Sequence, residues 1–120
     1  MSAPRAGSLL LIFSSLFLRA ESITLHPVPK EVVMARLRQA ASHNRDREAT
    51  LKKLFEDAGC RNEWIAEQPV KHLKIPNVIC TWPGSTDARI LVSAHTDHVS
   101  KGDGTVDDWS GAALLPDLIE

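Results

Sequence analysis

A continuous apolar run in the last third of the sequence places the strongest constraint on the fold. Residues 89–94 read Arg-Ile-Leu-Val-Ser-Ala, and a histidine, His95, follows directly. The run lacks the polar alternation of a half-exposed strand, so it predicts a strand buried on both faces, as in the middle of an α/β sheet. Ligands of open α/β sheets bind beyond the carboxyl ends of the strands. His95 is therefore expected to lie where these folds place their chemistry.

Two helices are predicted before this strand. Over residues 30–41 apolar side chains recur at steps of three and four, and Pro29 suits the first turn. Residues 42–44 can then cap a second helix, and Gly59 stands where a helix-ending glycine is expected. The apolar stripe of this second helix consists of Leu51, Leu54, Phe55 and Ala58.

Short strands and a last helix complete the pattern. Strands are predicted over residues 64–70 and 77–82, with Pro69 marking the first as an edge or an end. A final helix is expected to begin with Ser110 as its cap and to be kinked or stopped by Pro116.

Three side chains near the end of the apolar run have the chemistry of a metal site. The imidazole of His95 is a good zinc ligand, and Asp97 is close enough to accept a hydrogen bond from its other ring N–H. Twelve residues past His95, Asp107 offers two oxygens, and a carboxylate of this kind can bridge two cations. Gly102 and Gly104 allow the connecting loop to fold back over the strand end.

These two motifs together resemble a known family. Residues 90–97 (Ile-Leu-Val-Ser-Ala-His-Thr-Asp) and 106–113 (Val-Asp-Asp-Trp-Ser-Gly-Ala-Ala) are similar to the secreted di-zinc aminopeptidases. That family also contains glutamate carboxypeptidases and glutaminyl cyclases. Residues 77–84 and the helix that ends at Gly59 resemble it too. The resemblance implies an α/β fold, namely the N-terminal portion of a three-layer α/β/α zinc exopeptidase with helices and part of a mixed, mostly parallel sheet.

The resemblance also implies roles for individual residues. It makes His95 a terminal ligand of one zinc ion, Asp97 the catalytic-site residue that orients His95, and Asp107 the carboxylate that bridges both zinc ions. It further implies a cis peptide between Asp107 and Asp108. The implied substrate is a peptide, and the implied cofactor is zinc, with two ions in the complete family site and at most part of that site here.

The sequence departs from the family after Asp107. The family also uses a Glu-Glu pair, which supplies a general base and a ligand, and then a later acidic ligand and a distant histidine. None of these is matched, and Glu120 comes too early. We therefore expect residues 23–120 to form a truncated zinc-peptidase-like domain that is inactive alone. Two alternatives stay open: a related deacylase or carboxypeptidase fragment, because residues 95–99 fit the pattern His-x-Asp-x-Val, or a non-catalytic exported interaction module.

The N-terminus predicts export. Arg5 precedes an apolar run at residues 9–18, which is shorter than the roughly 20 residues that span a bilayer. This order is typical of a signal peptide, with cleavage after Ser22 or after Ala20, and a buried strand or helix is the alternative. The expectation is a signal peptide over residues 1–22, a secreted or periplasmic domain, and no stable membrane anchor after cleavage.

Composition and charge narrow the remaining possibilities. A hydrophobic content of 43% fits a packed domain, and a net charge of −1 without blocks of like charge argues against nucleic-acid binding. Cys60 and Cys80 are interpreted as two small buried hydrophobes, with a disulfide as the alternative in an exported chain. An incomplete sheet leaves an exposed edge, so self-association through that edge is expected.

Other polar residues near the motifs have simpler interpretations. Asp108 is expected to be a turn or N-cap residue, and Asp103 a turn residue between glycines. His98 is expected to be a solvated loop histidine, and Trp109 a partly buried loop anchor rather than a pocket wall. The histidines expected at the surface are His26, His43 and His72.

Overall fold

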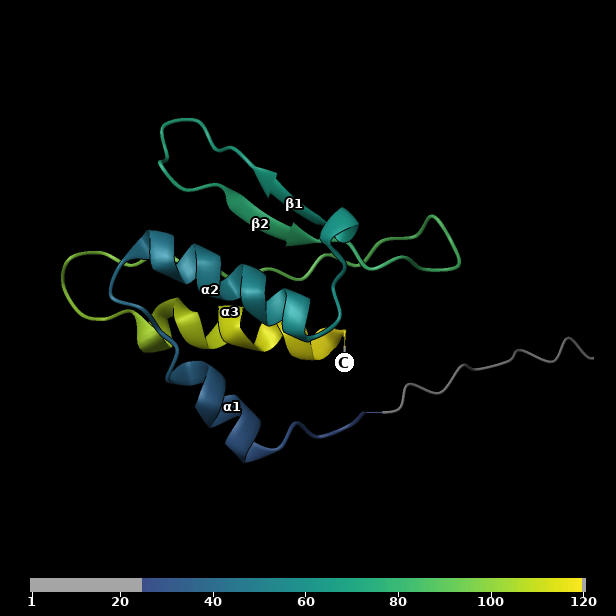
Figure 1. The fold of residues 1–120 in the computed structure, drawn as a ribbon, viewed down its shortest axis with the longest axis horizontal. Coiled ribbons are helices and arrows are strands. Elements are labelled where there is room, and N and C mark those ends of the chain that lie inside the picture. The colour runs from purple at the N-terminus through teal and green to yellow at the C-terminus, as the bar shows by residue number, and fades with distance from the viewer. Residues whose placement is uncertain (1–24, 120) are drawn as a thin grey trace, which may run out of the picture.

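The fold is that of a computed structural model that describes residues 25–119 (Figure 1). The expected signal peptide over residues 1–22 lies outside this part of the chain. Within residues 25–119, no helix is long and apolar enough to cross a membrane. Helices combine with a small sheet, so the predicted mixed α/β class is confirmed at that level.

Apart from the strand expected over residues 89–94, the helices and strands follow the predicted order along the described residues. They are α1 (Lys30–Leu37), α2 (Asn44–Asp57), the short helical turn η1 (Asn62–Trp64), β1 (Ile65–Gln68), β2 (Asn77–Cys80), the turn η2 (Thr105–Trp109), α3 (Ser110–Leu114) and the turn η3 (Leu115–Leu118).

Helix α2 is the central element, lying between the hairpin and α3 (Figure 1). Three of the four residues of its predicted stripe are buried, and Ala58 at its end is half-buried. Leu54 packs against Trp109 and the alanines of α3. Leu51 and Phe55 pack instead toward Cys60 and the hairpin. The helix ends as predicted, because the following Gly59 has a φ of 94°, which side chains rarely adopt.

The hairpin corrects two expectations. Strands β1 and β2 pair antiparallel, with Ile65 opposite Cys80, whereas a mostly parallel sheet was expected. The interpretation of the cysteines as separate hydrophobes is also wrong, because Cys60 and Cys80 form a disulfide across a Cα–Cα distance of 6.4 Å. The bond ties the segment that follows α2 to the end of β2.

The predicted central strand is not formed in the described residues. Residues 88–99 have no hydrogen-bonded strand partner, and Ile90 and Leu91 are 95% and 88% exposed. A strand is buried on both faces only when strands flank it and helices cover the sheet. Within residues 25–119, β1 and β2 pair only with each other, so nothing supplies those neighbours. The three-layer arrangement implied by the resemblance is thus not seen here.

The final helix is capped differently from the prediction. Helix α3 begins at Ser110, but the Ser110 hydroxyl donates back to the carbonyl of Val106 at 2.9 Å. Asp108, just before the N-cap position, instead accepts from the backbone N–H of Gly111 at 3.2 Å through its carboxylate, which agrees with the expected turn or capping role of Asp108. The α-helix ends at Leu114, two residues before Pro116, as expected from the missing N–H of proline.

Trp109 joins the helices more completely than predicted. Its side chain is 0% exposed, so partial burial was the wrong expectation, and its indole N–H donates to the Arg36 carbonyl at 3.2 Å. Arg36 also forms an ion pair with Asp117 of η3, and both side chains are almost fully buried.

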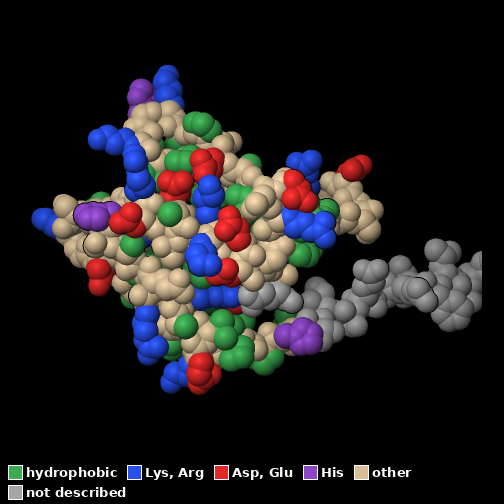
Figure 2. All heavy atoms as spheres, viewed as in Figure 1, with side chains coloured by type: hydrophobic (Ala, Val, Ile, Leu, Met, Phe, Trp, Pro, Cys, Tyr) green, Lys and Arg blue, Asp and Glu red, His purple; other side chains and the backbone are tan. Residues whose placement is uncertain are grey.

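The outer surface carries interspersed charges of both signs and no single-sign patch on the face shown in Figure 2.

Candidate metal site

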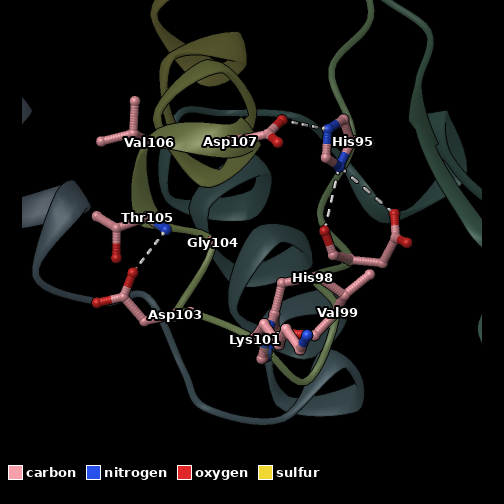
Figure 3. A pocket seen from close by; sticks show the side chains of 11 residues that line it. His95, His98, Val99, Lys101, Asp103, Gly104, Thr105, Val106 and Asp107 are labelled. Atoms are coloured by element: carbon pink, nitrogen blue, oxygen red, sulfur yellow. Dashed lines mark hydrogen bonds and ion pairs between the residues drawn. The ribbon is translucent and has the colours of Figure 1, made fainter.

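The two residues expected to bind metal lie side by side although twelve residues separate them. His95 follows the extended segment that runs behind α2, and Asp107 lies in the turn η2 before α3 (Figures 1 and 3). The Nε2 atom of His95 is 3.0 Å from Oδ1 of Asp107. The folded-back loop that the two glycines were expected to allow is therefore present, with φ of 88° at Gly102 and 56° at Gly104.

Asp97 holds the opposite side of the imidazole. The Nδ1 atom of His95 is 3.1 Å from the main-chain carbonyl oxygen of Asp97 and 3.5 Å from its carboxylate. Asp97 is thus the neighbour of Nδ1, with its carbonyl nearer than its carboxylate. In the metal-free chain an N–H at Nε2 can donate to the Asp107 carboxylate. A metal bound at Nε2 would replace that proton, and the N–H at Nδ1 would then donate to the Asp97 carbonyl.

The electrostatics of the pair follow from this geometry. The Asp107 carboxylate beside Nε2 raises the pKa of the His95 imidazole above its ordinary value, and the Asp97 carbonyl adds to the rise. Both side chains are open to solvent, with 51% of the His95 side chain and 92% of the Asp107 side chain exposed. The raised pKa therefore reflects a close carboxylate partner rather than burial.

The spacing of these atoms fits zinc. Two ligands of a tetrahedral zinc ion lie about 3.3 Å apart, since each bond is about 2.0–2.1 Å long. The 3.0 Å between Nε2 and Oδ1 is only a few tenths of an ångström shorter. Zinc sites normally need three or four protein ligands, and no cluster of three suitable side chains occurs within residues 25–119. The described residues thus supply a pair of ligands.

The loop between the two ligands borders a small open cavity of about 330 Å³, lined by residues 95, 97–99 and 101–107. Its shape depends on Gly104, since a Cβ there would lie 2.4 Å from the Cβ of His98. Asp103 is a turn residue as predicted: its carboxylate accepts from the Thr105 backbone N–H at 3.2 Å, which lowers the pKa of Asp103 (Figure 3). The loop is therefore ordered by its own hydrogen bonds and by close packing.

Asp108 has a second role that the sequence interpretation missed. Besides capping α3, its carboxylate lies 3.4 Å from the backbone N–H of His95, so it links the two segments of the site. A Cβ on Gly111 would lie 2.5 Å from this carboxylate, which explains a glycine at that position. The Asp107–Asp108 peptide is cis, as the resemblance implies.

The other histidines of the described residues differ in how exposed they are. His98 is a half-buried loop residue, with Nε2 2.9 Å from the Ser42 carbonyl and Nδ1 2.8 Å from that of Val99, so it is less open to solvent than expected. The histidines away from the site are exposed as expected: His26, His43 and His72.

The described residues thus bring a histidine and an aspartate together from two segments that a glycine loop joins. Comparison of families then gives the relationship: residues 77–120 match the sequence model of peptidase family M28, whose members are generally zinc-dependent. The matched segment carries both motifs, so this match supports their resemblance to zinc peptidases. No curated protein and no solved structure matches the chain.

Proposed function

We propose that this chain carries part of the co-catalytic di-zinc site of an exopeptidase of the aminopeptidase type. The observation that carries the proposal is the contact of His95 Nε2 with Asp107 Oδ1, at 3.0 Å, inside the segment that matches peptidase family M28. The proposed substrate is therefore a peptide, and its scissile carbonyl would face the His95–Asp107 pair.

Each of the three polar residues has a distinct part in the proposal. His95 offers Nε2 as a terminal ligand, while Asp97 fixes the ring by accepting at Nδ1. Asp107 is the bridging carboxylate, and its high exposure leaves both oxygens accessible. When bound, zinc supplies a water of lowered pKa and polarises the carbonyl of the substrate.

We further propose that these 120 residues do not hydrolyse peptides by themselves. Two ligands are fewer than the three or four that a zinc site needs, and no third joins them in the described part of the chain. No glutamate lies in the cavity to serve as general base, and a positioned base contributes roughly 10²–10⁴-fold to such reactions.

Export is part of the same proposal. The Cys60–Cys80 disulfide supports it, because such bonds persist in oxidising compartments and are rare in the cytosol. A secreted or periplasmic location agrees with the signal-peptide pattern of residues 1–22.

Calorimetric titration of the purified chain with zinc tests the site. We expect binding that is lost in His95→Ala and in Asp107→Ala, and unchanged in the controls His26→Ala and Asp87→Ala, which alter exposed residues away from the cavity. Loss in neither site variant would refute the assignment and favour an interaction module. Zinc-dependent release of N-terminal residues from peptides by this chain would refute the proposal that it is inactive alone.

A further inference from the structure

The first turn and a half of α2 faces the loops of the metal site. Asn44 and Arg47 lie on the same face of α2 as the buried leucines, since the steps from 44 to 47, 51 and 54 are three, four and three residues. On the N-terminal side of the leucines, this face of α2 forms hydrogen bonds with the main chain of residues 96–104. The polar end of the stripe is thus in contact with the site.

Arg47 joins the two segments of the site through its guanidinium. It is 0% exposed and sits 5.7 Å from the ring centre of Trp109. Its Nη1 donates to the carbonyl of Thr96 at 3.3 Å and to that of Gly104 at 3.2 Å, and its Nη2 donates to the carbonyl of Asp103. One planar group therefore binds the segment next to His95 and the loop that leads to Asp107.

Asn44 adds a second attachment at the same place. Its side-chain amide donates to the carbonyl of His98 at 3.2 Å, and its Oδ1 accepts from the backbone N–H of His98 at 3.0 Å. This reciprocal pair fixes the chain three residues past His95. Both residues bind main-chain atoms of the loops, so they fix the position of the loop backbone.

Stability alone does not account for a guanidinium at this position. Burying a charge costs free energy, and an apolar side chain of similar volume often stabilises a core as well or better. The guanidinium of Arg47 donates to main-chain carbonyls, namely those of Ala41, Thr96, Asp103 and Gly104. The fixed fork of five donors lets one arginine hold four carbonyls at once, whereas lysine has three donors and methionine has none.

We propose that Arg47 and Asn44 are positioning residues that clamp the two loops of the site, and so hold His95 and Asp107 at metal-binding distance. This inference rests on the proposed function, because it concerns the same two ligands. Neither residue touches the metal position, so their effect is on the spacing of the ligands.

The test compares Arg47→Met and Asn44→Ala with the unmodified chain and with Arg45→Met, a neighbouring exposed arginine on α2. Hydrogen–deuterium exchange of the metal-free protein measures the order of residues 95–106. Zinc titration of the same variants, read also by the visible spectrum of bound Co²⁺, measures the ligand spacing. We expect exchange in 95–106 to rise at least tenfold in both site variants, with the β1–β2 hairpin unchanged, and zinc affinity to fall about 10–100-fold, as for other outer partners of metal ligands.

Each outcome decides the inference. Unchanged exchange in residues 95–106 and unchanged zinc affinity in both variants would overturn it. If Arg47→Met unfolds the whole chain, Asn44→Ala decides, because it removes only the pair of bonds to His98 from a half-buried side chain. If the loops loosen but His95→Ala leaves zinc affinity intact, the clamp stands and the proposed function fails. If His95→Ala abolishes binding while both clamp variants bind normally, the proposed function stands and the clamp fails.

Discussion

Replacement of Gly104 by alanine is the sharpest test of how the site loop is packed. The residue has a φ of 56°, and an alanine in the left-handed region loses about 1–2 kcal/mol. Its Cβ would lie 2.4 Å from the Cβ of His98 and 3.0 Å from Nη1 of Arg47, so the loop must shift. That shift breaks the hydrogen bond from Arg47 to the Gly104 carbonyl, and a bond from a charged donor contributes about 1.5–3 kcal/mol. We therefore expect a total loss of about 3–4 kcal/mol in the free energy of unfolding.

Gly102→Ala is the matched control, because Gly102 also has a positive φ, of 88°, but a Cβ at that position would have no atom within 4 Å. It should lose only the backbone contribution of about 1–2 kcal/mol. Urea denaturation followed by circular dichroism measures the two losses of free energy. In thermal denaturation, the excess loss for Gly104→Ala should lower the melting temperature by roughly 4–8 °C for each kcal/mol. Equal losses in the two variants would show that the close packing of Gly104 against His98 and Arg47 has no energetic weight.

Three further predictions concern the disulfide, the histidine and the exposed run. Replacing both Cys60 and Cys80 by serine should destabilise the chain by about 3 kcal/mol, from the entropy of a loop of this size, and equal urea midpoints would contradict this. The pKa of the His95 imidazole should fall in Asp107→Asn, which NMR titration of the imidazole checks. Because the folded pKa is raised, the His95–Asp107 pair stabilises the metal-free chain fully below about pH 6.5, the unfolded value, and this stabilisation is lost as the pH rises through the folded pKa. Because residues 90–92 are apolar and exposed, the chain should self-associate as its concentration rises, and a monomer at all concentrations in analytical ultracentrifugation would refute this.

Local patterns predict the helices and the ends of the elements well. The stripe of α2, its terminating Gly59 and the stop before Pro116 each depend on neighbours within a few residues. The cavity loop is predictable for the same reason, since its two glycines permit the turn. The side-chain pair of His95 and Asp107 follows from motif spacing once the loop folds back.

The remaining features depend on contacts that are distant in the sequence. Whether residues 89–94 pair as a central strand depends on strands that residues 25–119 do not supply. The Cys60–Cys80 bond depends on how the hairpin folds back beside the end of α2, which spacing alone does not reveal. Arg47 is different, because a signal was present: it stands four residues before Leu51, on the apolar stripe, where a charged side chain needs a buried partner.

The central position of α2 has a consequence for which changes of chain length the molecule can accept. The same helix presents leucines to the core and Arg47 to the site loops, and successive residues turn by about 100° around its axis. One residue inserted between Arg47 and Leu51 would rotate these two groups apart, so that the core and the site could not both be satisfied. The turn at residues 83–87 is exposed and lies outside the helices and strands, so an affinity tag or a fluorescent label can be inserted there.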